Sequence, residues 1–343
     1  MILLTKTINQ KPGERTAIRL SSERRMAVLL IIGDPIMSKN KTKREKLKEY
    51  SFRYNRNGYL LIAPAVTAIL LLSVYPLLNG IWISFLNYDM TKARASDFGT
   101  FAGLKNYLVI FANSKYRNAV ANSVIWTIVN LIVQVLLATG IALVLNEKLK
   151  GRAFFRTLAL LPWAIPAAIS ALTFSALYDT KIGAFNAILI RLGILDEGYS
   201  FLGNVGTAMP AVIIANVWKS TPFLMIFILA ALQGVSYDMY ESAAIDGAGK
   251  IKRFLYITLP NIKEPMAVAV ILNAISIFNN FNAIWLLTQG GPLNSTEIMY
   301  TYAYRQAFVD HKFGYAAATS VVIFIVIAIL TVIYIKMISS KKD

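Results

Sequence analysis

The chain has 343 residues, of which 56% are hydrophobic and only 15% are charged, and its mean hydropathy is +0.54. This composition excludes an ordinary soluble globular domain and points to a membrane protein. The formal net charge of +17 could suggest nucleic-acid binding. However, lysine and arginine residues that set membrane topology account for much of the excess, so we expect no nucleic-acid partner.

The first 58 residues are polar overall and precede the first long apolar stretch. Within them, 26–32 is apolar but too short to cross a bilayer, which requires about 20 residues. Three interpretations of 1–36 are open: a mobile tail, an interfacial helix, or an over-extended start before a native initiator at Met37. We expect 1–58 as a whole to form a cytoplasmic N-terminal tail.

Six stretches in the rest of the chain are long and apolar enough to cross a membrane. They predict an all-α, polytopic membrane domain over 59–338, followed by a short C-terminal end at 339–343. We expect the prolines of the third and fourth stretches (Pro162, Pro166 and Pro222) to kink the helices without ending them, because neighbouring helices can satisfy the freed backbone groups. The predicted spans are 59–85, 119–145, 153–178, 206–232, 265–287 and 313–338.

The distribution of lysine and arginine between the connecting segments predicts the orientation of the spans. Because the number of spans is even, both termini lie on the same side of the membrane. The flanking segments on that side carry 17 lysines and arginines, and those on the opposite side carry 9. We therefore expect both termini to be cytoplasmic, together with the long connection 233–264 between the fourth and fifth spans.

The 233–264 connection interrupts the apolar sequence with charged residues and glycines, and contains the stretch YESAAIDGAGKIKRFLYITLP. Its first part, 237–245, is rich in helix-forming residues and has acidic residues near its start, where negative charge suits the helix dipole. Gly247 then predicts a left-handed stop. The segment 248–259 predicts a second helix, ended by the proline that follows it.

The same stretch resembles the Glu-Ala-Ala loop of the membrane subunits of bacterial ABC importers. The sequences around Pro222-Phe223 and over 287–292, which reads LTQGGP, resemble the carbohydrate branch of these permeases. The resemblance implies the six-helix core of a type I ABC importer permease, with the loop as its coupling helix. The matching residues of the loop are Glu241, Ala243, Ala244, Asp246, Gly247, Ala248 and Phe254.

In such importers the coupling helix docks in a groove of a cytoplasmic ATPase subunit and drives alternating access. This chain contains no G-x-x-x-x-G-K-[ST] motif, so we expect ATP and Mg²⁺ on two partner ATPase subunits and no cofactor on the chain itself. The implied heteromeric assembly also contains a second, homologous permease subunit, an extracytoplasmic solute-binding protein and membrane lipid. The resemblance thus implies a transport subunit of the bacterial inner membrane and not an enzyme.

Polar side chains inside apolar spans are costly and usually face a cavity or another helix. Two groups of them lie in the fourth and fifth predicted spans, where asparagine and serine can also bond between helices. Resemblance to maltose-type subunits implies that these positions line a sugar pathway, in which amides bond hydroxyl groups and aromatic rings stack on the sugar. The candidate positions are Asn216, Lys219, Ser220, Phe223, Phe278, Asn279 and Asn280.

Lys219 departs from the maltose-type pattern, in which this position is apolar. An unpaired cation near the middle of the membrane costs roughly 2.5–3.5 kcal/mol, so Lys219 needs a partner. One alternative is a carboxylate or phosphate of the substrate, which would make the cargo an acidic oligosaccharide such as a uronate, or a sugar or glycerol phosphate. The other is a backbone carbonyl freed by Pro222, or a carboxylate of the partner permease.

The sequence leaves other transport functions open besides carbohydrate import. A permease of the same architecture could carry an amino acid or a polyamine. An ion-coupled secondary carrier should have an internal repeat and acidic residues within its spans, but the six predicted spans contain no aspartate or glutamate. The sequence has no cysteine and a single histidine, His311, so we expect no metal site, and no catalytic constellation lies in the spans.

Overall fold

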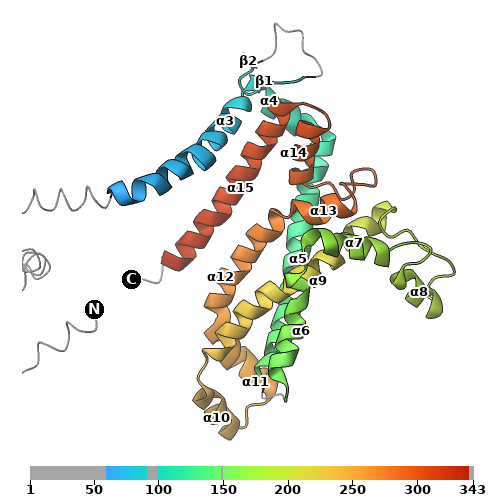
Figure 1. The fold of residues 1–343 in the computed structure, drawn as a ribbon. Helices are drawn as coiled ribbons and strands as arrows, with labels where there is room; N and C mark the ends of the chain where they lie inside the picture. Colours follow the sequence, from blue (N-terminus) through green and yellow to red (C-terminus); the bar gives the residue numbers. More distant parts are fainter. Residues whose placement is uncertain (1–58, 91–98, 148–149, 340–343) are drawn as a thin grey trace, which may run out of the picture. The chain divides into compact units, whose positions relative to one another are not determined.

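The computed structural model describes three stretches of the chain, which are 59–90, 99–147 and 150–339, and they are mostly helical (Figure 1). The all-α fold class is therefore confirmed. The predicted tail 1–58, with its three interpretations, and the last residues, 340–343, lie outside the described residues. The chain divides into two units, Met1–Tyr75 and Pro76–Asp343, and the second contains all of the candidate site residues.

The helices include a few long apolar ones and several short ones in the connections. Two short antiparallel strands, β1 (Leu86–Asn87) and β2 (Thr100–Phe101), lie between α3 and α4. The helices and π-helical turns are η2 Leu70–Val74, α3 Tyr75–Ile83, α4 Lys105–Ala112, α5 Ser114–Asn146, α6 Arg152–Ala164, α7 Ala167–Leu177, α8 Ala184–Arg191, α9 Val205–Gln233, α10 Tyr237–Ile245, α11 Lys250–Arg253, η3 Phe254–Thr258, α12 Leu259–Phe278, α13 Phe281–Leu287, α14 Met299–Phe308 and α15 Phe313–Ser339.

Among the described residues, five helices are long and apolar enough to cross a membrane, and a bent pair brings the number to six if it counts as one span. The fourth predicted span corresponds to α9, which continues through Pro222, so the expectation that this proline does not end the helix is confirmed. The first, second, fourth and sixth predicted spans correspond to the continuous helices Tyr59–Ile83, Ser114–Asn146, Val205–Gln233 and Phe313–Lys336.

The third predicted span is broken, and the expectation that its prolines only kink the helix is wrong for Pro166. Helix α6 contains Pro162 but ends at Ala164, and α7 begins at Ala167 at an angle of 92° to it. Ile165 and Pro166 have extended backbone, with ψ of 133° and 143°. The reason is that proline lacks an N–H donor and disfavours the α conformation in the residue before it, and here two prolines lie four residues apart.

The fifth span begins earlier than predicted, and the expectation of a separate helix over 248–259 is wrong. Helical structure runs from Lys250 through η3 into α12 without interruption. Pro260 lies in the first turn of α12, directly after the π-helical turn has changed the hydrogen-bond pattern, so its missing N–H is tolerated. At the far end, Asn279 and Asn280 separate α12 from α13.

Helix α5 packs along α9, and α12 lies against both (Figure 1). The buried alanines Ala138 and Ala142 of α5 belong to one core cluster with Leu224 and Ile228 of α9. Small residues let two helix backbones approach closely, which favours helix contacts in a bilayer. In this arrangement α10 and α11 lie at one end of the long helices, and α4 and α14 lie at the opposite end.

Candidate functional site

A buried network of amides joins α5, α9, α12 and the start of α13. Asn216 of α9 donates from Nδ2 to Oδ1 of Asn130 at 2.7 Å, and Asn280 donates to Oδ1 of Asn216 at 2.8 Å. Asn273 of α12 donates to Oε1 of Gln134 at 2.9 Å. Four of these side chains are at most 2% exposed, and only Asn280 is partly exposed. Amides that cannot reach water need protein partners, so this network holds the helices together.

Lys219 lies on α9 one turn beyond Asn216 and reaches the break between α6 and α7. Its Nζ donates to the backbone carbonyl of Ile165 at 2.5 Å. The partner of Lys219 is therefore a backbone carbonyl next to a proline. That proline is Pro166, whereas the sequence suggested a carbonyl freed by Pro222. In the described part of the chain, Lys219 forms no ion pair. A neutral carbonyl occupies one of the three N–H donors and leaves the positive charge of the ammonium group uncompensated.

One face of α9 carries a strip of candidate residues, hereafter the α9 strip. They are spaced as i, i+3, i+4 and i+7, which places them on the same side of a helix, and they are Asn216, Lys219, Ser220 and Phe223. Ser220 Oγ donates to Asn216 Oδ1 at 3.3 Å. The ring centroids of Phe223 and of Trp163, near the end of α6, are 6.1 Å apart. Because Lys219, Ser220 and Phe223 are partly exposed, the strip presents an ammonium group, a hydroxyl group and an aromatic ring beside the broken helix.

The candidates of the fifth span lie at the end of α12 and in the break between α12 and α13. Phe278 is buried in a core cluster with residues of α14, such as Tyr302. Asn279 is exposed, and its Oδ1 accepts a hydrogen bond from the hydroxyl group of Tyr300. Asn280 Oδ1 accepts a backbone N–H of α13 at 3.3 Å and caps that helix. The structure therefore joins Asn280 to the α9 strip and directs Phe278 and Asn279 toward α14.

The connection between α9 and α12 forms a helical elbow. Helix α10 covers the residues predicted for it, and Gly247 has a φ of +76°, which confirms the predicted left-handed stop. Two backbone hydrogen bonds close the turn, from Gly247 to Ala244 at 3.1 Å and from Ala248 to Ala243 at 2.8 Å. A hydrogen bond of 3.0 Å between the hydroxyl groups of Tyr240 and Thr258 also ties α10 to η3 and stiffens the elbow.

Helix α10 presents an apolar and acidic surface. Tyr237 is 67% exposed and Ile245 is 83% exposed. Large apolar side chains exposed on one short helix suit a contact with another protein or with lipid. Of the predicted coupling residues, Ala243, Ala248 and Phe254 are partly buried, and the exposed ones are Glu241, Ala244, Asp246 and Gly247.

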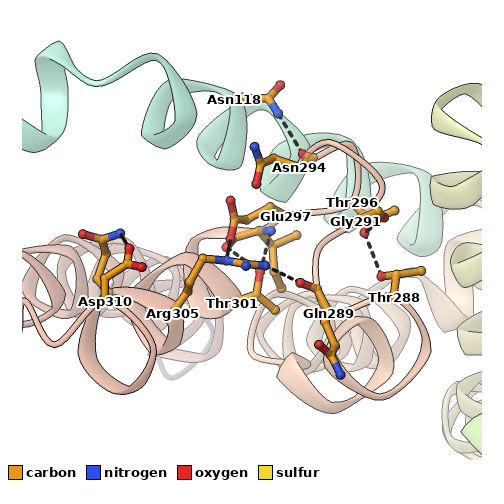
Figure 2. Close-up of polar contacts among 12 residues, drawn as sticks. Asn118, Thr288, Gln289, Gly291, Asn294, Thr296, Glu297, Thr301, Arg305 and Asp310 are labelled. Atoms are coloured by element: carbon orange, nitrogen blue, oxygen red, sulfur yellow. Dashed lines mark hydrogen bonds and ion pairs between the residues drawn. The ribbon is translucent and has the colours of Figure 1, made fainter. Parts of the chain in front are cut away.

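A compact loop over 288–298, hereafter the 288–298 loop, lies at the end opposite α10 and is fixed by an ion pair with a buried carboxylate (Figure 2). Arg305 of α14 donates from Nε to Oε1 of Glu297 at 2.8 Å and from a terminal amino group to the carbonyl of Gln289 at 2.5 Å. Glu297 is only 1% exposed. Burial raises the pKa of Glu297, and the hydrogen bond and charge of Arg305 offset this effect in part.

Further hydrogen bonds tie the 288–298 loop to α5 and to itself. Asn118 and Asn122 of α5 donate to the carbonyl of Asn294 at 2.9 and 3.1 Å. Within the loop, Thr296 Oγ1 donates to the carbonyl of Gly291 at 2.7 Å (Figure 2). Gly290 has a φ of +86°, and a Cβ there would lie 3.2 Å from Cβ of Glu297, so this turn requires glycine.

The pH dependence of stability should report the buried carboxylate of Glu297. Because its pKa in the folded state is raised above the ordinary value of 4.5, the folded state binds more protons than the unfolded state between the two values. The stabilising contribution is therefore complete below the unfolded pKa and is lost as the pH rises through the folded pKa. Glu297→Gln should remove this part of the pH dependence in unfolding curves of the purified protein. An identical pH profile for both proteins would contradict the expectation.

The comparison with protein families decides the class of this chain. Residues 117–342 match the family described as binding-protein-dependent transport system inner membrane component. The chain belongs to this family. The resemblance to ABC importer membrane subunits is therefore confirmed, and the chain is a multi-pass inner-membrane permease.

Similar proteins agree with this assignment. The permease is 36% identical to the trehalose/maltose transport system permease protein MalF of Thermococcus litoralis over 85% of its own length and 97% of that protein. It is 31% identical to the sulfoquinovosyl glycerol transport system permease protein SmoG of Agrobacterium fabrum, over 82% and 90% of the two chains. A solved bacterial ABC transporter involved in the import of the acidic polysaccharide alginate shares its fold, with a TM-score of 0.71, 23% identity and coverage of 86% and 99%.

Several residues of the amide network, the α9 strip and the 288–298 loop have no recognisable motif in the sequence of this permease. The amide partners on α5, Asn130 and Gln134, lie in an apolar span that showed no motif. The aromatic neighbour of the α9 strip, Trp163, lies in a different predicted span. Glu297 and Arg305 are eight residues apart, and their charges were the available signal, but the burial of Glu297 arises from the packing of α5 and α14 around the loop.

Proposed function

We propose that this permease forms half of the translocation pathway of an ATP-driven, binding-protein-dependent importer of a sugar or oligosaccharide. The observation that carries the proposal is the α9 strip, where Lys219, Ser220 and Phe223 meet the break between α6 and α7. A hydroxyl group beside an aromatic ring suits a sugar, which has hydroxyl groups around its ring and an apolar face. Relatives named for trehalose/maltose and for sulfoquinovosyl glycerol transport support a carbohydrate as the cargo.

Lys219 extends the proposal to an acidic cargo. Its ammonium group has a neutral acceptor in the carbonyl of Ile165, so two N–H donors and the full charge are available to a carboxylate or phosphate. An oligosaccharide with uronate units, or a sugar or glycerol phosphate, would provide that anion. A polyamine is disfavoured because the same charge would repel it.

The 233–264 connection is the proposed contact with a cytoplasmic ATPase subunit, which holds ATP and Mg²⁺. The exposed Tyr237 and Ile245 provide apolar contact area, and the carboxylate of Glu241 can pair with a cation of the ATPase. The turn at Gly247 and the hydrogen bond between Tyr240 and Thr258 support a rigid elbow. Rigidity is required because a flexible connection would absorb the movement that ATP binding produces.

The proposed assembly has a cytoplasmic side, an extracytoplasmic side and a second permease subunit. Both termini and α10 lie on the cytoplasmic side, and the 288–298 loop faces the extracytoplasmic solute-binding protein. A second, homologous permease subunit completes the pathway. The apolar side chains exposed on α5 and α15, such as Leu136 and Ile329, are available to that subunit and to membrane lipid.

Uptake by the complete transporter in proteoliposomes tests the proposal. The wild-type complex should accumulate a labelled acidic oligosaccharide only when ATP is inside and the binding protein is outside. Lys219→Ala should lower this uptake about 10-fold or more, because a hydrogen bond to a charged group contributes roughly 1.5–3 kcal/mol. Lys219→Arg, which keeps the charge, is the matched control and should retain most of the activity.

Two results would overturn parts of the proposal separately. Uptake of the acidic oligosaccharide at the wild-type rate by Lys219→Ala would remove the acidic cargo. Wild-type uptake that needs neither ATP nor the binding protein would remove the importer itself.

A further inference from the structure

We propose that Asn130 of α5 is a positioning residue of the translocation pathway. It acts through Asn216 and fixes the polar groups that Ser220 and Asn280 present to the cargo. This inference rests on the proposed function. It adds a residue from a helix that carries none of the candidate positions, and it changes the role of Asn216 from a pathway-lining residue to an internal support.

The orientation of the Asn130 amide is fixed by its hydrogen bonds. Its Nδ2 donates to the backbone carbonyl of Trp126, one turn earlier on α5, at 2.8 Å. Its Oδ1 accepts from Asn216 Nδ2 at 2.7 Å and, more weakly, from Gln134 Nε2 at 3.4 Å. A flipped amide would place two donors opposite each other on one side and two oxygens on the other. Because Asn130 is fully buried, water cannot replace these partners.

Asn216 links Asn130 to two residues that are partly exposed. Its Oδ1 accepts from Asn280 Nδ2 at 2.8 Å and from Ser220 Oγ at 3.3 Å. An amide oxygen has two lone pairs, so both are occupied. Asn216 itself is only 2% exposed, whereas Ser220 and Asn280 are partly exposed. The side chain of Asn216 is therefore placed to hold these two groups, and little of it is accessible to a ligand.

The network determines which hydrogen-bonding groups remain for a ligand. Ser220 donates its O–H to Asn216, so its oxygen remains as an acceptor. Asn280 donates one N–H to Asn216 and accepts the backbone N–H of Ala283, so its second N–H remains as a donor. A sugar with hydroxyl groups that match this acceptor and this donor would be favoured over an analogue that lacks one of them. Without Asn130, the amide of Asn216 could rotate and the pattern would be lost.

Sugar discrimination by the complete transporter in proteoliposomes tests the inference. Uptake of labelled trehalose, maltose and a uronate trisaccharide identifies the best probe, which is then compared with its monodeoxy analogues. The wild type should prefer the probe over at least one analogue by about 3- to 10-fold, as expected for one hydrogen bond. Asn130→Leu and Ser220→Ala should each lower this preference about 3-fold or more, and the double variant should lose no more than either. Because every variant uses the same binding protein, a change in the preference reports the permease.

Three further variants separate positioning from stability. Asn273→Leu removes a buried amide of the same network that bonds Gln134 and not Asn216. It should lower the unfolding temperature, as Asn130→Leu does, but keep the wild-type preference. Thr127→Val removes a hydroxyl group that bonds only within α5 and should change neither quantity. Asn130→Asp keeps an acceptor oxygen toward Asn216 and should retain most of the preference.

The outcomes separate this inference from the proposed function. If Asn130→Leu does not assemble, Asn130→Ala takes its place with the same expectation, because the smaller side chain leaves room for water. An unchanged preference in the variant that assembles, even with a lower stability or uptake rate, would overturn the positioning role alone, because Asn130 would then only hold the helices together. A wild type that transports the probe and all its analogues equally would also overturn it. Absence of any sugar uptake by the wild-type complex would overturn the proposed function and this inference with it.

Discussion

Replacement of Arg305 by alanine should lower the free energy of unfolding by about 3–5 kcal/mol, because the buried carboxylate of Glu297 would lose its cationic partner. The variant also loses the hydrogen bond to the carbonyl of Gln289, which closes the 288–298 loop. We expect a large decrease in the unfolding temperature of the purified protein in detergent. Circular dichroism during heating, or a thermal scan followed by size-exclusion chromatography, would measure it.

The double variant Arg305→Ala with Glu297→Gln is the matched control for this prediction. The second substitution removes the buried charge, so the double variant should be more stable than Arg305→Ala alone. Arg305→Lys should be intermediate, because an ammonium group keeps the charge but does not reproduce the planar arrangement of donors. If the double variant is as unstable as Arg305→Ala, the loss comes from another contact of Arg305 and the role of the ion pair is contradicted.

On the proposed function, Gly247→Pro should abolish ATP-driven uptake while leaving the membrane helices folded. Proline fixes φ near −65°, whereas Gly247 has a φ of +76°. The substitution also removes the N–H that donates to the carbonyl of Ala244 and closes the turn of the elbow. Uptake, substrate-stimulated ATP hydrolysis and co-purification with the ATPase subunits should all be lost together.

A pair of alanine variants distinguishes the effect of the backbone conformation at Gly247 from the effect of adding a side chain to the turn. Gly249 has a φ of −68° and open space around it, so Gly249→Ala should behave like the wild type. Gly247→Ala places a Cβ on a left-handed residue, which costs roughly 1–2 kcal/mol, and should weaken coupling without abolishing it. A stable and active complex in Gly247→Pro would count heavily against the coupling role of the elbow.

The elbow could be predicted from the sequence because its determinants are local. Helix-forming residues over 237–245 and the glycine at 247 lie within a few residues of the structure that they specify. The break at Ile165 could not be predicted in the same way. Two prolines are compatible with a kink or with a break, and the donor that satisfies the Ile165 carbonyl comes from Lys219, 54 residues later.

The exposure of the candidate pathway residues also could not be predicted from the local sequence. A motif assigns Phe278, Asn279 and Asn280 to one group, but their exposure depends on contacts with helices far away in the sequence. Phe278 is buried against α14, whereas Asn280 bonds Asn216, 64 residues away. The sequence pattern therefore identified the helices that carry the candidate site, and only the packing showed which of its side chains are exposed.

The continuity of helical structure from Lys250 to Phe278 has a mechanical consequence. At 1.5 Å per residue, this stretch forms a connecting rod roughly 40 Å long. One end of the rod is tied to α10 through Thr258, and the other ends next to Asn280, which bonds Asn216 of the α9 strip. Because η3 and Pro265 lie within the rod without interrupting its helical structure, we expect a push on the elbow to be transmitted to the far end.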